Sequence, residues 1–86
     1  MNMKMLYNWI SEIKSIGKHV LVSIGVSDVA CKAIELRVDF EDFQGKKYGC
    51  FEAINIENEN IPDWRLFKAL NKIKSFMKSS CLFKKQ

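Results

Sequence analysis

Apolar and charged residues alternate without a break from Ile34 to Phe40, the pattern of a strand buried on one face. Ile34, Leu36, Val38 and Phe40 would face a core, and the charged residues between them would face away. A slip of one residue would bury the charges instead, so the pattern also fixes the register of this strand. The sequence therefore predicts a half-buried strand at the centre of the fold.

The segments on either side of this strand predict a small sheet. Residues 18–24 and 47–56 are expected to be further strands, the first from its alternating valine and isoleucine residues. Gly45 would lie in the hairpin loop before the third strand, and Gly49 is expected to mark a bulge in it. Because short turns join consecutive strands, we predict a three-stranded antiparallel meander.

An amphipathic helix is predicted on each side of the strand-forming segment. Apolar residues follow the spacing of one helix face over residues 3–16 and again over residues 64–79. Pro62 and Asp63 precede the second helix and are typical of a helix start. Residues 80–86 would form a mobile basic tail. The predicted fold class is therefore α+β, in the order α-β-β-β-α, with both helices packed on one face of the meander.

Composition limits the chain to one small folded unit. Its 86 residues suffice for a single core, and we expect the range 1–86 to form one domain. Hydrophobic residues make up 48% of the chain and charged residues 28%, as in folded globular proteins. No apolar run approaches the roughly 18 residues of a membrane span, and no secretion signal is recognisable. The protein is expected in a cytoplasm, without membrane contact.

Charge is distributed unevenly along the chain. Residues 1–63 carry 7 lysines and arginines against 10 acids, whereas residues 64–86 carry 7 lysines and arginines and no acid. Such a division indicates two surfaces with different partners, or one partner met by both. Arg65, Lys68 and Lys72 form a basic stripe on the predicted second helix, and they are candidates for contact with nucleic-acid phosphates. The plainer alternative is a solvated helix face.

Nothing in the sequence predicts catalysis, a cofactor or a bound metal ion. His19 is the only histidine and falls on the outward register of the first strand, where it would be solvated. Cys31, Cys50 and Cys81 are widely spaced, so they are expected as free, mostly buried thiols. No phosphate-binding glycine loop or dinucleotide fingerprint is present. We therefore expect a protein that acts by binding.

Two kinds of surface are candidates for contact with another macromolecule. Leu21, Arg37 and Phe51 fall on the outward face of the sheet, where an uncovered, partly apolar patch would suit a protein partner. Acidic residues gather at both ends of the sheet, where they would either imitate nucleic-acid phosphates or simply keep the loops soluble. They are Asp28, Glu57, Glu59 and Asp63 at one end, and Asp39, Glu41 and Asp42 at the other.

Four short stretches occur in order along these elements. They are Met1-Asn2, Glu12-Ile13-Lys14, residues 34–38 with their Leu36-Arg37-Val38, and Glu57-Asn58-Glu59. Together with the element order, they resemble phage anti-CRISPR proteins of the Cas9-inhibitor type. The resemblance implies a non-catalytic inhibitor, from a phage or mobile element, that binds a CRISPR–Cas effector in the host bacterial cytoplasm. It would block the nucleic-acid-binding groove of the effector as a DNA mimic, and its basic helix would touch guide RNA or DNA.

Three functions stay open at this point. The first is the inhibitor, acting as a monomer or a homodimer through the acidic ends and the outward sheet face. The second is a small nucleic-acid-binding module or phage regulator that uses the basic second helix. Against the first, the anti-CRISPR proteins it resembles are acidic in their C-terminal half, whereas this chain is basic there. A dimeric structural protein of a mobile element is a third possibility.

Overall fold

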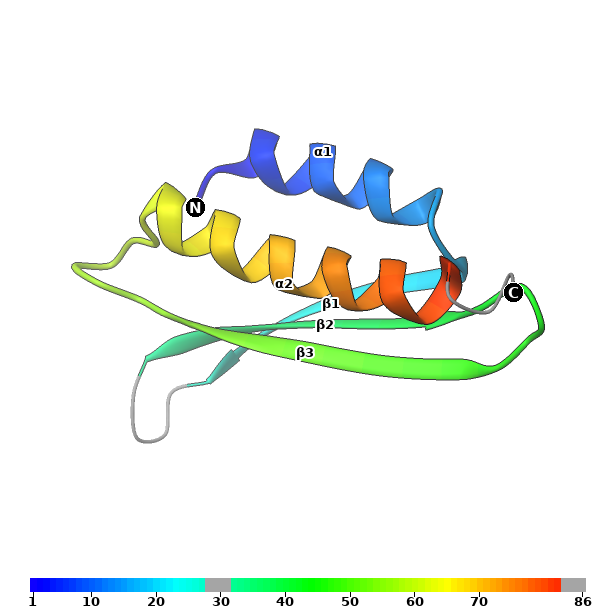
Figure 1. Ribbon diagram of the computed structural model, residues 1–86. Coiled ribbons are helices and arrows are strands. Elements are labelled where there is room, and N and C mark those ends of the chain that lie inside the picture. Colours follow the sequence, from blue (N-terminus) through cyan, green and yellow to red (C-terminus); the bar gives the residue numbers. More distant parts are fainter. Residues whose placement is uncertain (28–31, 83–86) are drawn as a thin grey trace.

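The computed structural model describes residues 1–27 and 32–82, and its elements follow the predicted order. They are α1 (Met3–Lys14), β1 (Lys18–Ser27), β2 (Ala33–Glu41), β3 (Lys47–Asn55) and α2 (Asp63–Leu82). The strands form one antiparallel sheet in the order β1-β2-β3, and both helices lie on the same face of it (Figure 1). The predicted α+β fold with an antiparallel meander is therefore confirmed.

The central strand β2 supplies the face on which the helices pack. Leu36, Val38 and Phe40 are buried, as their alternation predicts, and the charged residues between them lie on the other face. The helices cover these side chains with two apolar stripes. The buried residues of the stripes are Leu6, Trp9 and Ile13 from α1, and Leu66, Ala69, Leu70, Ile73, Met77 and Cys81 from α2.

The two helices run in the same direction across the sheet, and their N-termini are tied together (Figure 1). The Asn2 side chain caps α1 by accepting a hydrogen bond from the Met5 N–H at 3.0 Å, and it donates to the Asp63 carboxylate at 3.2 Å. Parallel helices place two positive dipole ends side by side. The negative charge of Asp63 at that end therefore favours the arrangement.

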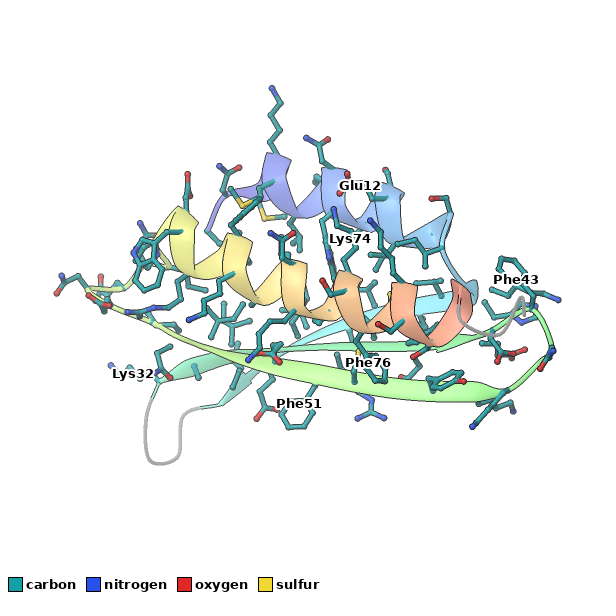
Figure 2. All side chains as sticks on the ribbon, in the orientation of Figure 1. Glu12, Lys32, Phe43, Phe51, Lys74 and Phe76 are labelled. Carbon is teal, nitrogen blue, oxygen red and sulfur yellow. The ribbon has the colours of Figure 1, made fainter. Side chains whose placement is uncertain are left out.

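Two further contacts join the helices along their length. The indole N–H of Trp9 donates to the Leu70 carbonyl at 2.9 Å, inside the core. One turn further along, Lys74 Nζ lies 3.3 Å from Glu12 Oε1, and Figure 2 shows the two side chains meeting between the helices. These contacts fix the position of α1 relative to α2, so the helices cover the sheet as one layer.

Two details of the predicted sheet are wrong. β1 continues beyond residue 24 to Ser27, because its pairing with β2 holds as far as Ala33. The bulge expected at Gly49 is absent, since the register between β2 and β3 runs unbroken along both strands. The irregularity lies instead near the start of β1, where His19 has a φ of 52°. The role of Gly49 is instead to leave room for two charged side chains on the face of the sheet away from the helices.

The second helix is longer than predicted. Its apolar stripe continues to Cys81, which is fully buried, so the helix does not end near Ser79. The predicted tail therefore begins too early, and its last residues, 83–86, lie outside the described residues. In the described part of the chain, no helix is long and apolar enough to cross a membrane.

Candidate partner-binding surface

The face of the sheet that carries no helix is the first candidate surface, and we call it the outer face. Leu21 on β1 and Phe51 on β3 lie on it with 62% and 58% of their surface exposed. Figure 2 shows Phe51 projecting away from the helices. The register places Asp39 opposite Leu21, and Arg37 opposite Phe51. Leu21, Arg37 and Phe51, predicted from the sequence, are therefore neighbours on one open surface.

Arg37 and Asp39 form an ion pair across the middle of the outer face. Arg37 Nη2 lies 3.1 Å from Asp39 Oδ1, and Arg37 Nε lies 3.3 Å from Asp39 Oδ2. Gly49 makes room for this pair, because a Cβ there would lie 2.9 Å from both Arg37 Nη2 and Asp39 Oδ1. Gly49 thus allows the Arg37 and Asp39 side chains to lie close to the backbone of β3. The outer face carries a paired charge at its centre and an exposed apolar side chain on each neighbouring strand.

The loop before α2 holds the predicted acids of one sheet end. Glu57 forms an ion pair with Arg65, and Asp63 accepts a hydrogen bond from the side chain that caps α1. Glu59 is exposed and has a φ of 62°. Asp28, the fourth acid expected at this end, lies outside the described residues. Two of the three described carboxylates are therefore already held by groups of the chain itself.

At the other end of the sheet, Asp39 and Glu41 are partly exposed but Asp42 is not. Glu41 Oε2 lies 3.2 Å from Nδ1 of His19, whose side chain is mostly exposed, and Asp39 is paired on the outer face. Asp42 is fully buried, so the prediction that it faces a partner is wrong. The acids predicted to imitate phosphates therefore do not form one free negative surface.

Asp42 instead holds the hairpin loop between β2 and β3. Its Oδ1 accepts hydrogen bonds from the backbone N–H groups of Gln44 and Lys46, both at 2.9 Å, and its Oδ2 accepts one from the Tyr48 hydroxyl at 3.4 Å. Gly45 has a φ of 87°, as its place in the predicted loop requires. An aspartate that bonds the N–H two residues on is a common turn device. This turn pattern is visible in the sequence, but the prediction of Asp42 as a surface acid did not take it into account.

The contact between Tyr48 and Asp42 predicts a pH dependence. Burial, followed by the nearby Asp42 carboxylate, raises the pKa of Tyr48 above its ordinary value. The folded state therefore holds the phenolic proton more tightly than the unfolded chain does. The resulting stability is complete below the pKa of an unfolded tyrosine, about 10, and is lost as the pH rises through the folded value. We expect the free energy of unfolding to fall above about pH 10, and to fall less steeply in Tyr48→Phe.

Urea titrations followed by circular dichroism, repeated at increasing pH, measure this slope. Tyr7→Phe is the matched control, because Tyr7 is 62% exposed on α1 and its hydroxyl is not part of the hairpin loop. The control should follow the parent protein. A slope in Tyr48→Phe that equals that of the parent would show that the phenolic proton of Tyr48 does not contribute.

The basic stripe predicted on α2 is only partly available to a partner. Arg65 forms an ion pair with Glu57 of the loop before the helix, and its Nη1 donates to the Asn55 carbonyl at 3.1 Å. Lys72 Nζ lies 3.8 Å from Glu52 Oε1 on β3. Lys68 is exposed and forms no ion pair with a described residue. The stripe therefore presents less free positive charge than the sequence suggests.

The structure adds an open groove between α2 and β3 that was not predicted. It has a volume of about 620 Å³, and its lining includes Cys50, Phe51, Glu52, Lys68, Lys72 and Phe76. The Phe76 ring packs edge-on against the rings of Phe40 and Tyr48, which anchors one wall. The sequence does not predict this groove, because the apolar stripe of α2 specifies which helix face is buried but not how close the helix lies to β3.

The remaining candidate groups are the thiols. Cys50 is half-buried, Cys81 is buried, and both are free. Burial raises the pKa of each thiol, so neither is activated as a nucleophile. Cys31 lies outside the described residues. Within residues 1–27 and 32–82, no group of three or more histidine, cysteine, aspartate or glutamate side chains is placed to hold a metal ion.

The chain was compared with protein-family models, with curated proteins and with solved structures. None of the three comparisons finds a match. Any function must therefore be argued from the sequence, the fold and the surfaces described above.

Proposed function

We propose that this protein is a non-catalytic inhibitor that binds a bacterial CRISPR–Cas effector of the Cas9 type and blocks its nucleic-acid-binding groove. The observation that carries the proposal is the outer face, where exposed Leu21 and Phe51 lie beside the paired Arg37 and Asp39. An exposed aromatic, an arginine and apolar neighbours on one surface are typical of protein interfaces. The Cas9-type effector is proposed as the partner because of the resemblance in element order and in four short stretches.

The proposed contact relies on the outer face more than on negative charge. The carboxylates of Glu41, Glu57 and Asp63 already have partners within the chain. A surface of paired charges mainly selects the right partner and orientation, whereas burial of Leu21 and Phe51 would supply affinity. The inhibitor would therefore exclude nucleic acid by occupying the groove, with the exposed Glu59 as an acidic contact at its rim.

An order-of-addition assay tests the proposal. The purified protein is mixed with each of a panel of Cas9–guide RNA complexes before target DNA is added, and DNA cleavage is followed over time. We expect a stoichiometric amount to abolish cleavage by at least one member of the panel. Inhibition should be much weaker when target DNA is bound first, because the groove is then occupied. Undiminished cleavage by every member of the panel would refute the proposal.

Direct nucleic-acid binding through α2 is the second candidate function. The exposed Lys68 and the excess of basic residues on this helix favour it. Gel mobility shifts with duplex DNA and RNA at graded salt distinguish the two functions. A nucleic-acid-binding module would show affinity that falls steeply with salt and is lost in the double variant Lys68→Glu/Lys72→Glu. An inhibitor that acts through the outer face would bind both duplexes weakly at physiological salt.

A further inference from the structure

The groove between α2 and β3 runs along a strand edge that no other described strand covers. β3 pairs with β2 on one side only, so the N–H and C=O groups of alternate β3 residues point away from the sheet. Residues 50–52 of this edge line the groove. An extended chain placed there would find backbone hydrogen-bond partners that are otherwise left to water.

Aromatic side chains flank the same edge on both sides of the sheet. Phe76, 42% exposed, lies between α2 and β3, whereas Phe51 projects from the outer face (Figure 2). Successive side chains of an extended peptide point to opposite faces. In a peptide paired with β3, every second side chain would therefore lie on the helix side, near Phe76, and the others would lie near Phe51 on the outer face.

The positive charge of the groove favours a ligand with negative charge. Lys68 and Lys72 stand on the α2 wall, and Glu52 on β3 is the only acid among the lining residues. The side chain of Lys72 stays 63% exposed and reaches Glu52 only at 3.8 Å. The excess of positive charge, on flexible and exposed side chains, is complementary to an acidic ligand.

The groove is long enough for a short peptide. The helix rises about 12 Å between Lys68 and Phe76, which is the length of about four residues of extended chain. A single-stranded nucleic acid would meet the same lysines and aromatic rings. It has no backbone amides with which to continue a β-sheet, so the free strand edge favours a peptide.

We propose that this groove binds a short, acidic, extended segment of a partner protein, which adds to β3 as a fourth strand. The site lies at the edge of the sheet and does not rest on the proposed inhibitor function, although Phe51 borders both surfaces. Inhibition of an effector through the outer face and peptide binding at β3 can each fail without the other.

Titration of the full chain with defined peptides, followed by the backbone amide signals in NMR, tests the proposal. The first probe is a hexapeptide that alternates glutamate with valine. We expect it to shift the amide signals of residues 50–52 and to slow the hydrogen exchange of those whose N–H points away from β2. A hexapeptide that alternates lysine with valine should bind at least about tenfold more weakly, and tenfold corresponds to about 1.4 kcal/mol. The glutamate peptide with every backbone amide N-methylated should be weakened by at least the same factor.

Charge reversal on the protein supplies the matched test. Lys68→Glu/Lys72→Glu should weaken the glutamate peptide at least about tenfold and reverse the preference towards the lysine peptide. Lys4→Glu/Lys14→Glu changes the net charge equally on exposed positions of α1 and should leave binding unchanged. Equal affinity for both peptides, or no effect of N-methylation, would overturn the proposal. Displacement of the glutamate peptide by a short oligouridylate that does not protect the β3 amides would overturn it in favour of nucleic acid.

Discussion

Replacing Trp9 with alanine is expected to lower the free energy of unfolding by about 3–5 kcal/mol. The side chain is 3% exposed and fills the space where α1 meets α2. Its indole N–H also donates to the Leu70 carbonyl, so the substitution removes both the packing and a contact between the helices. A domain of this size is stabilised by only about 4–13 kcal/mol in total. The substitution therefore removes a large fraction of the stability of the domain.

Urea unfolding followed by circular dichroism measures this loss. Trp64→Ala is the matched control, because Trp64 is 62% exposed and its ring stacks on the Arg65 guanidinium at the surface. We expect it to cost less than about 1 kcal/mol. Trp9→Phe keeps a buried ring without the N–H, so it should fall between Trp9→Ala and the parent protein. Equal losses in the two alanine variants would contradict the assignment of Trp9 to the junction of the helices.

Replacing Asp42 with alanine is expected to cost about 3–5 kcal/mol, because bonds to a charged acceptor contribute about 1.5–3 kcal/mol each. The change leaves the N–H groups of Gln44 and Lys46 without the carboxylate that accepts them at 2.9 Å. It also removes the acceptor of the Tyr48 hydroxyl. Asp42→Asn retains one acceptor oxygen and should lose less.

The local readout for Asp42 is amide hydrogen exchange. The amides of Gln44 and Lys46 should exchange much faster in Asp42→Ala than in the parent protein, even where the rest of the sheet stays protected. Asp39→Ala is the matched control, since the Asp39 carboxylate is paired with Arg37 on the exposed outer face. Its removal should cost less than about 1 kcal/mol. If the loop amides were unaffected in Asp42→Ala, the carboxylate would not be what holds the loop.

The parts of the fold that the sequence predicted are those in which local pattern and tertiary packing agree. The alternation from Ile34 to Phe40 specified both the central strand and its register, because a slip would bury charges. The two apolar stripes specified which faces of the helices are buried. With one apolar sheet face to cover, both helices had to lie on the same side.

The errors arise where tertiary contacts override local signals. Ser79 and Ser80 favour the end of a helix, but burial of Cys81 extends α2 past them. Gly25 and Ser27 are typical of turns, yet pairing with β2 keeps them in β1. Local pattern describes neither effect, because each depends on a segment distant in the chain.

The candidate surface was predictable only in part for the same reason. The outward register of Leu21, Arg37 and Phe51 follows from strand periodicity alone. The ion pair of Glu57 with Arg65 depends on how the loop folds back on α2, and the hydrogen bond from Asn2 to Asp63 requires the N-terminus to meet the start of α2. The sequence therefore overstated the free negative charge, and with it the similarity to a DNA mimic.

Site-specific photocrosslinking tests most directly whether the outer face is the surface that meets the effector. A photoreactive phenylalanine derivative is placed at Phe51 on the outer face, or at Tyr7, an exposed aromatic position on α1. Each variant is irradiated with the Cas9–guide RNA complex that the parent protein inhibits. We predict a covalent adduct with the effector from position 51 and none from position 7. An adduct from position 7 alone would contradict binding through the outer face.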